Sequence, residues 1–148
     1  MLALFGHPHL SLSHIRLEAF TEVFRRQSPE TNIMIEHPEV IEESEKVTLR
    51  YLQSNTRPDV IFCMGDLILI GVMNAIHHLG LKVPNDIAVI SISNGFIPTL
   101  YNPKITHVET SGYTLGKQAS QQMFRRLKNE QAEQMIIVES KLVQGGSI

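Results

Sequence analysis

The sequence predicts an α/β fold with a mainly parallel sheet. Along the 148 residues, short apolar runs alternate with longer segments in which apolar residues recur at helical spacing, and this alternation is typical of such sheets. The segment 57–96 is the clearest case, because it holds an apolar run, a turn, a helical stretch, a glycine, a proline-containing turn and a second apolar run. In such sheets the carboxyl ends of the strands are the usual ligand-binding edge.

The first part of the chain is predicted to form two strand–helix pairs. The apolar run 2–5 is predicted as a strand and 33–35 as a shorter one. The segment 13–26 has helical spacing. The segment 38–53 is predicted as the next helix, since acidic residues at its start suit the positive end of the helix dipole. The stripe expected to face the sheet from the first helix is Ile15, Ala19, Phe20, Val23 and Phe24.

The central segment is predicted as a βαβ unit. The run 60–63 is apolar, as in strands buried on both faces of a parallel sheet. Asp66 is predicted to cap the helix 67–79 with its side chain, and Gly80 is predicted to end that helix. A second buried strand is expected to start with 87–90.

The last third of the chain is predicted to return to the sheet after a long helix. A loop is expected at 93–104 and a short strand at 105–108. The segment 111–128 carries an apolar side at helical spacing. Two closing strands are expected at 135–138 and 141–143.

Composition places the chain among soluble globular proteins of one domain, in which 43% hydrophobic and 19% charged residues are ordinary values. A net charge of −2 gives no sign of a nucleic-acid surface. The single cysteine, Cys63, falls in an apolar strand, which indicates an inert buried thiol and fits a reducing, cytoplasmic compartment. No secretory signal or membrane-spanning segment is predicted.

The sequence does not predict an enzyme. It has no nucleophile elbow, P-loop or dinucleotide-binding glycine motif in the required context. His7, His9 and His14 gather around one loop, but no matching acidic or cysteine residues accompany them at ligand spacing. We therefore predict neither a metal nor another cofactor.

Three segments, in order and at matching spacing, carry a family resemblance. They read PDVIFCMGD at 58–66, HHLGLKVPNDIAVISISN at 77–94 and ITHVET at 105–110. Together they resemble the effector-binding domain of the LacI/GalR family of bacterial transcription regulators, and the likeness runs from about residue 2 to 146. The resemblance implies a Rossmann-like three-layer αβα fold, the lobe of a type I periplasmic binding protein.

In that family the effector domain has two lobes and follows a helix-turn-helix DNA-binding domain, so it is much longer than this chain. By resemblance, 1–107 and 136–148 belong to the C-terminal lobe. Residues 108–135 belong to the N-terminal lobe, and no DNA-binding domain is expected in this chain. The helix at 111–128 then lacks its usual partner. We expect it to pack on its own lobe, on a second copy or in a swapped dimer.

The effector-binding residues are expected by resemblance. Arg16 stands in an Arg-Leu-x-Gly-Phe motif, here with Ala for Gly, whose arginine points into the effector cleft. Asp66 matches an acidic residue of the family, while Ser93 replaces an aspartate that is common in sugar- and purine-responsive members. Asn94 either substitutes for that aspartate or serves the turn before Gly95. The set expected to contact the effector is Arg16, Ser93, Asn94, Asp66, His7 and His9.

The helix that starts near Leu67 is apolar on nearly every side, whereas a sheet covers only one of its faces. The other face is expected to meet a second subunit, as it does in the family, unless a loop of the same chain covers it. Tyr101 would be an aromatic anchor. The interface expected on these grounds comprises Leu67, Ile70, Met73, Leu100 and Tyr101.

The function predicted from these residues is effector sensing and dimerisation within a LacI-type transcriptional regulator. The expected partners are a small-molecule effector (a sugar, sugar phosphate or nucleobase) and a second copy of the chain. DNA is contacted only through a domain that this chain does not contain, and no membrane is involved. Two alternatives stay open: part of a periplasmic-type solute-binding protein, and a truncated dimerisation module that binds no ligand.

Overall fold

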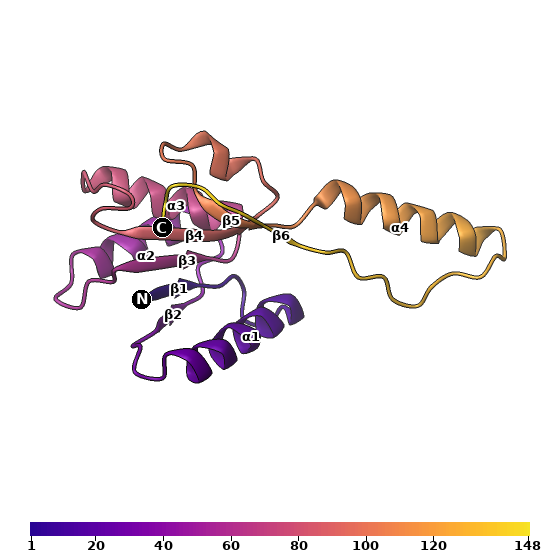
Figure 1. The fold of residues 1–148 in the computed structure, drawn as a ribbon, viewed down its shortest axis with the longest axis horizontal. Coiled ribbons are helices and arrows are strands. Elements are labelled where there is room, and N and C mark those ends of the chain that lie inside the picture. Colours follow the sequence, from indigo (N-terminus) through magenta and orange to yellow (C-terminus); the bar gives the residue numbers. More distant parts are fainter.

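A computed structural model describes residues 1–148 and shows one sheet with helices on both sides, from which a separate arm extends (Figure 1). In chain order the elements are β1 (Leu2–Leu4), α1 (Ser11–Gln27), β2 (Met34–Glu36), α2 (Ile41–Leu52), β3 (Val60–Cys63), α3 (Asp66–His78), β4 (Ala88–Ser93), the 3-10 helix η1 (Ile97–Leu100), β5 (Thr106–Glu109), α4 (Gly112–Leu127) and β6 (Lys141–Val143).

The six strands lie in the order β2-β1-β3-β4-β5-β6. Every neighbouring pair is parallel except β5 and β6, which run antiparallel. The predicted α/β fold with a mainly parallel sheet is thereby confirmed. β1 has β2 on one side and β3 on the other, so the chain changes its direction of travel across the sheet between β1 and β3.

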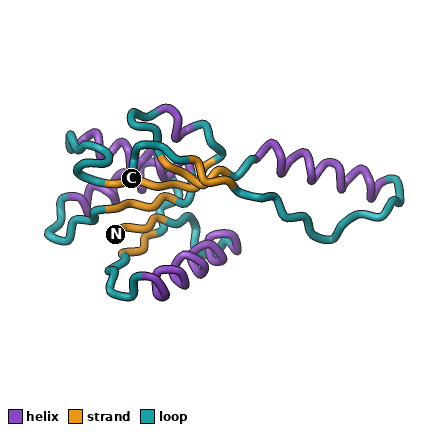
Figure 2. The backbone as a smooth tube through the Cα atoms, viewed as in Figure 1, coloured by secondary structure: helices purple, strands orange, loops and turns teal.

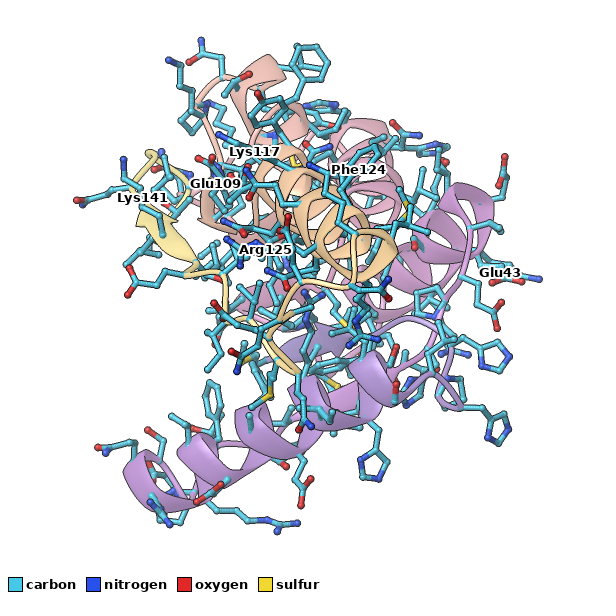
Figure 3. All side chains as sticks on the ribbon, turned by 90° about the vertical axis from the view of Figure 1, so that its right-hand side faces the viewer. Glu43, Glu109, Lys117, Phe124, Arg125 and Lys141 are labelled. Atoms are coloured by element: carbon cyan, nitrogen blue, oxygen red, sulfur yellow. The ribbon has the colours of Figure 1, made fainter.

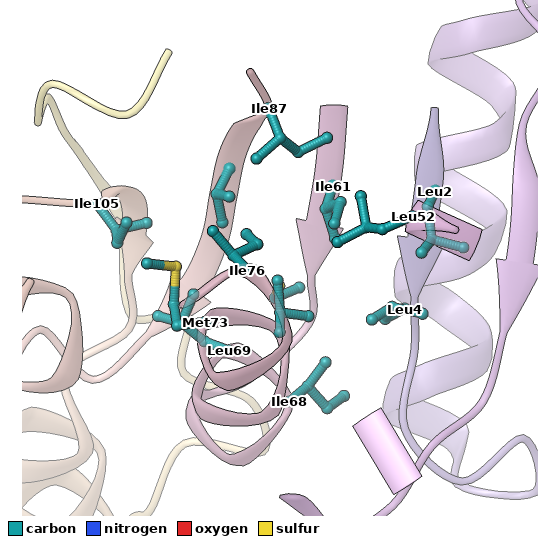
Figure 4. Close-up of a cluster of buried hydrophobic side chains, with 13 residues drawn as sticks. Leu2, Leu4, Leu52, Ile61, Ile68, Leu69, Met73, Ile76, Ile87 and Ile105 are labelled. Carbon is teal, nitrogen blue, oxygen red and sulfur yellow. The ribbon is translucent and has the colours of Figure 1, made fainter. Parts of the chain in front are cut away.

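Helices cover the sheet unequally. α1 lies on one side, and α2 and α3 lie together on the other (Figures 1 and 2). The main hydrophobic core is the layer beneath α2 and α3 (Figure 4). It consists of Leu2, Leu4, Leu52, Ile61, Cys63, Ile68, Leu69, Val72, Met73, Ile76, Ile87, Val89 and Ile105.

The apolar character of α3 is explained within this chain. The sheet covers one face, and α2 packs closely on another, at Gly71. Met73 is only 3% exposed and belongs to the core. The expectation that Met73 lies at a subunit interface is therefore wrong for this single-chain structure, because α2, which the sequence argument did not count, covers much of what the sheet leaves open.

α1 packs through aromatic side chains. The ring centroid of Phe20 lies 5.6 Å from that of Phe5 and 4.9 Å from that of Phe62. Of the predicted stripe, Phe20 and Phe24 are half-buried, whereas Ile15 and Val23 are exposed to 62% and 57% and Ala19 is also exposed. The stripe is thus only partly correct, since apolar residues occur on more than one side of this helix.

α3 ends as predicted at Gly80, which has a φ of +66°. The N–H of Gly80 donates to the carbonyl of His77 and the N–H of Leu81 to that of Ile76, both at 3.0 Å. These two bonds form the Schellman arrangement, whose left-handed residue favours glycine.

The carboxyl-terminal residues are fixed between two strands. The Oγ of Ser147 accepts a hydrogen bond from the N–H of Thr106 (2.8 Å) and donates to the carbonyl of Val89 (2.5 Å). The N–H of Val89 in turn donates to the carbonyl of Ser147 (2.9 Å). A buried serine therefore joins β4 to β5 next to the chain end.

α4 and the segment 128–140 form the arm, which projects from the carboxyl edge of β5 away from the rest of the molecule (Figures 1 and 2). No residue of α4 is buried, and side chains such as Lys117, Phe124 and Arg125 surround the helix (Figure 3). Of the three expected placements, packing on its own lobe is therefore wrong. Large apolar side chains exposed on the arm are Tyr113, Leu115, Met123, Phe124, Leu127, Met135 and Ile137.

The strand predicted at 135–138 is not formed. These residues carry no backbone pairing, because no neighbouring strand is within reach on the arm. Ile136 and Val138 instead line a hollow together with Leu115, Ala119 and Met123 of α4. Of the two predicted closing strands, only β6 (Lys141–Val143) forms, where the chain returns to the sheet. None of the helices is long and apolar enough to cross a membrane.

Candidate functional site

The candidate site lies at the carboxyl edge of the sheet, between β1 and β3. In open α/β sheets this edge binds ligands at the point where the strand order reverses, and that point is here the β1/β3 boundary. The loops after β1, β3 and β4 all leave the sheet at this edge, because these strands are parallel. The arm leaves from the same edge after β5.

A pocket of about 310 Å³ opens between the β1–α1 loop, the residues before α2 and the start of α3. Of the six expected effector residues it contains His7 and Asp66; Arg16, Ser93, Asn94 and His9 lie outside its lining. Its lining is Gly6, His7, Leu10, Pro38, Glu39, Gly65, Asp66, Leu67 and Ile68.

Asp66 is held by the end of β4. The Oγ of Ser93 donates to one carboxylate oxygen of Asp66 at 2.5 Å, and the N–H of Asn94 donates to the other at 3.4 Å. The Oγ of Ser93 also accepts from the N–H of Gly95 at 3.0 Å. The structure therefore joins Asp66, Ser93 and Asn94 in one hydrogen-bonded group.

The prediction that Asp66 caps α3 is wrong. Gly65 occupies the cap position with no side-chain bond to the helix, and Asp66 is the first helical residue. Its carboxylate still lies at the positive end of the helix dipole, which favours an anion there. The hydrogen bonds from β4 direct the carboxylate away from a capping role.

Asn94 serves the turn, the second of the two roles considered for it. Its side-chain oxygen accepts from the N–H of Phe96 at 3.1 Å, while Gly95 has a φ of +98°. A Cβ placed on Gly95 would lie 3.2 Å from the carboxyl carbon of Glu109. Glu109, which the sequence argument did not select, is thus a second carboxylate beside this turn; its place at the end of β5 was the available signal.

His7 is tied to its own loop and to the segment before α2. Its Nδ1 accepts from the N–H of His9 at 3.1 Å, and the two imidazole centroids are 5.3 Å apart. Its Nε2 lies 3.6 Å from a carboxylate oxygen of Glu39. His7 therefore borders the pocket, whereas His9 is exposed beside it.

Arg16 lies one turn inside α1 and is half-buried. Burial lowers the pKa of its guanidinium, as expected when a charged group loses solvent. The three ion pairs of the chain are His7–Glu39, Glu22–Arg26 and Glu36–Arg50, so no carboxylate is paired with Arg16.

The predicted interface residues divide into two groups. Leu67 and Leu100 are exposed to 54% and 61%. Ile70 and Tyr101 are half-buried, and Tyr101 packs against the core with its ring 6.1 Å from that of His77. Burial raises the pKa of Tyr101. Phe96, which was not predicted, is 64% exposed on the loop that leads to η1 and adds to the apolar surface.

Cys63 is fully buried under this surface. Burial strongly raises the pKa of its thiol, which keeps the reactive thiolate form unpopulated near neutral pH. The prediction that this thiol is buried is confirmed.

Residues 1–148 match the family model described as a periplasmic binding protein-like domain. The chain is 30% identical to the HTH-type transcriptional repressor PurR of Histophilus somni over 144 residues, covering 89% of this chain and 43% of the repressor. It is 28% identical to the ribose operon repressor of Halalkalibacterium halodurans over 115 residues, covering 78% of this chain and 34% of that protein.

Solved structures share the fold. A LacI family transcriptional regulator from Bifidobacterium animalis superposes with a TM-score of 0.86 at 24% identity, and a dimeric Lac repressor with a C-terminal deletion gives 0.88 at 18%. In both cases the superposition covers 99% of this chain and 54% of the other chain. The chain thus spans about half the length of those structures, and 43% or less of the two repressors above.

Proposed function

The chain belongs to the periplasmic binding protein-like domain family, and from that premise we propose that it senses a small-molecule effector within a LacI-type transcription regulator. The expected resemblance to such regulators agrees with the repressors among its relatives and with the fold of the Lac repressor. In this proposal, DNA is recognised by the part of those relatives that this chain does not span. The assembled regulator acts in the cytoplasm.

The observation that carries the proposal is the position of the Asp66 group. It lies at the strand-order reversal of the sheet, beside an open pocket and at the edge from which the arm leaves. An effector bound there contacts the lobe on one side and faces the direction of the arm on the other. Such a ligand changes the balance between two lobe arrangements only if it binds one of them more tightly.

The arm supports the proposed division into lobes. We assign α4 and the following residues, up to the return of β6, to a second lobe. The arm carries exposed apolar side chains, and 135–138 has strand composition without a strand beside it. Both features suit a segment that completes another sheet-and-helix layer.

Dimerisation through α3 and η1 is the second part of the proposal. Leu67, Leu100 and Phe96 present exposed apolar side chains, with Tyr101 anchored beneath. Aromatic and aliphatic side chains of this kind form the centres of protein interfaces. A ligand-free dimerisation module would use the same surface, so effector binding is what distinguishes the two functions.

Calorimetric titration with ribose, ribose 5-phosphate and hypoxanthine tests the proposal. We expect one of these chemical classes to bind, and Asp66→Ala to lose that binding while the chain stays folded. Asp59→Ala is the matched control, since Asp59 is an exposed aspartate just before β3, at the opposite edge of the sheet. Absence of binding throughout the panel would contradict the sensing function and leave the dimerisation module.

A further inference from the structure

We propose that Asn94 is a covalent modification site, at which the side-chain amide reacts with the peptide nitrogen of Gly95. The two groups form a cyclic imide, and water opens the imide to leave an aspartate or an isoaspartate in place of the asparagine. This inference requires no effector and is independent of the proposed sensing function. It concerns the same hydrogen-bonded group, because the N–H of Asn94 donates to Asp66.

Asn94 is the only asparagine of the chain that a glycine follows. A side chain on the following residue hinders the approach of its peptide nitrogen to the asparagine amide, and glycine has no side chain. Asn94 is exposed, and Gly95 has a φ of +98°, which glycine adopts without strain. Water and space are therefore both available here. The other six asparagines precede larger residues; they are Asn32, Asn55, Asn74, Asn85, Asn102 and Asn129.

The attacking nitrogen already directs its proton at an acceptor. The N–H of Gly95 donates to the Oγ of Ser93 at 3.0 Å, and that Oγ donates its own proton to a carboxylate oxygen of Asp66 at 2.5 Å. Two hydrogen bonds in series thus lead from the peptide nitrogen to a carboxylate, and such chains polarise their members. An acceptor held in this way assists removal of a proton from a nucleophile, as a general base does.

The carbonyl that is attacked already accepts a backbone N–H. The Oδ1 of Asn94 accepts from the N–H of Phe96 at 3.1 Å. When the nitrogen of Gly95 attacks the Cγ of Asn94, negative charge develops on this oxygen, and an N–H directed at it stabilises that charge. The nitrogen and Cγ belong to adjacent residues, so ring closure avoids the entropy cost of bringing two molecules together.

The reaction consumes one water molecule and releases ammonia. A bond forms between the nitrogen of Gly95 and the Cγ of Asn94, while the side-chain nitrogen leaves as ammonia with the proton that Gly95 loses. Water then adds to one of the two imide carbonyl carbons and breaks its bond to nitrogen. Opening at Cγ gives aspartate, and opening at the main-chain carbon gives isoaspartate. Either product carries an additional carboxylate, which is ionised at neutral pH.

The new carboxylate forms beside two others. The N–H of Asn94 lies 3.4 Å from a carboxylate oxygen of Asp66, and the carboxyl group of Glu109 lies beside Gly95. Like charges at such spacing repel one another. In isoaspartate the backbone also gains a carbon atom before Gly95, which displaces its N–H from the hydroxyl of Ser93. We therefore expect modification to disrupt the hydrogen bonds that hold Asp66 at the pocket.

Incubation of the 148-residue chain at neutral pH, followed by peptide mapping in a mass spectrometer, tests the proposal. Exchange of the amide for a carboxylate raises the mass of the peptide that contains Asn94. We expect this conversion to be about tenfold faster in the native chain than in urea, because only the fold holds the proton acceptor and the N–H donor in place. The exposed Asn55 and Asn85 are internal references and should convert slowly in both states.

Ser93→Ala removes the acceptor of the Gly95 proton and should slow native conversion to the rate of the unfolded chain. Ser91→Ala is the matched control on β4, because the Oγ of Ser91 donates to the carbonyl of Ile92 at 2.9 Å; it should convert like the wild type. If Ser93→Ala fails to fold, the comparison of native and urea-unfolded wild type still decides. A native chain that converts no faster than the unfolded one, or a folded Ser93→Ala chain that converts like the wild type, would overturn the proposal.

Discussion

Gly71 of α3 faces Ser44 of α2 so closely that a Cβ on Gly71 would lie 2.5 Å from the Cβ of Ser44. The same atom would be 2.3 Å from the carbonyl oxygen of Ile41. The two helices therefore approach at a position where only glycine fits, and this contact brings α2 over a face of α3 that the sheet leaves uncovered.

Gly71→Ala should destabilise the chain although alanine favours helices. The added methyl must push two helix backbones apart, and overpacking of this kind costs about 1–3 kcal/mol. Urea unfolding followed by circular dichroism measures the change. Gly116→Ala in α4, where a Cβ meets nothing within 4 Å, is the control and should be neutral or stabilise by about 0.5–1 kcal/mol. Equal behaviour of the two variants would contradict the close approach.

Ser147→Ala should loosen the edge of the sheet. The substitution leaves the buried N–H of Thr106 without its acceptor and removes a hydrogen bond to the carbonyl of Val89. We expect the unfolding free energy to fall by about 1–3 kcal/mol. Hydrogen exchange should accelerate at Thr106 and Val89 while the amides of β1 stay protected. The exposed Ser140→Ala serves as the reference, and a uniform acceleration over the sheet would argue against a local clamp.

Alkaline pH should weaken the fold partly through Tyr51. Its hydroxyl donates to Glu36 at 2.7 Å, and this bond is the largest cause that raises the pKa of Tyr51 above its usual value of 10.0. The folded chain then holds that proton to higher pH than the unfolded chain, so the stabilisation is complete below about pH 10 and disappears as pH rises through the folded pKa. Tyr51→Phe should show a shallower loss of unfolding free energy between pH 9 and 11 in urea titrations.

The absence of such a difference in slope would mean that the Tyr51–Glu36 bond does not persist in solution. Tyr113→Phe is the control for loss of a tyrosine hydroxyl, because Tyr113 is 82% exposed on the arm.

Leu100→Glu and Met73→Glu should separate association from folding. Leu100 is 61% exposed and Met73 is 3% exposed. Leu100→Glu should therefore keep the unfolding free energy within about 0.5 kcal/mol of the wild-type value. In sedimentation velocity it should convert a dimer to a monomer. The second buries an unpaired charge and should cost about 3 kcal/mol or more. If Leu100→Glu sedimented like the wild type, the proposed interface would have to lie elsewhere.

The sequence predicted the elements that local signals determine. The strand at 60–63, the glycine stop at Gly80 and the long helix near 111–128 were found because apolar period and helix-ending chemistry act over a few residues. The strand at 135–138 failed for the opposite reason. Strand composition is necessary for pairing, but a strand also needs a neighbour, and the arm offers none.

The sequence suggested which residues gather at this edge of the sheet, but it could not show how they are hydrogen-bonded to one another. Asp66 was selected by its position after β3 and does line the pocket at this edge, yet its predicted role as a cap was wrong. Its partner Ser93 stands 27 residues further along the chain, and only the pairing of β3 with β4 brings the two together. Glu109 was missed although its place at the end of β5 was an available signal. Phe96 was missed because nothing in its local sequence indicates that it borders the Gly95 turn.

One serine also joins the pocket to the arm. While the hydroxyl of Ser93 holds Asp66, its carbonyl accepts the N–H of Thr110 at 2.8 Å, at the first residue beyond β5. The 16 residues of α4 make a rod about 24 Å long. A tilt of about 5° at Thr110 would therefore move the far end of α4 by about 2 Å. The residue that holds Asp66 of the pocket is thus also the residue from which a small displacement would be amplified along the arm.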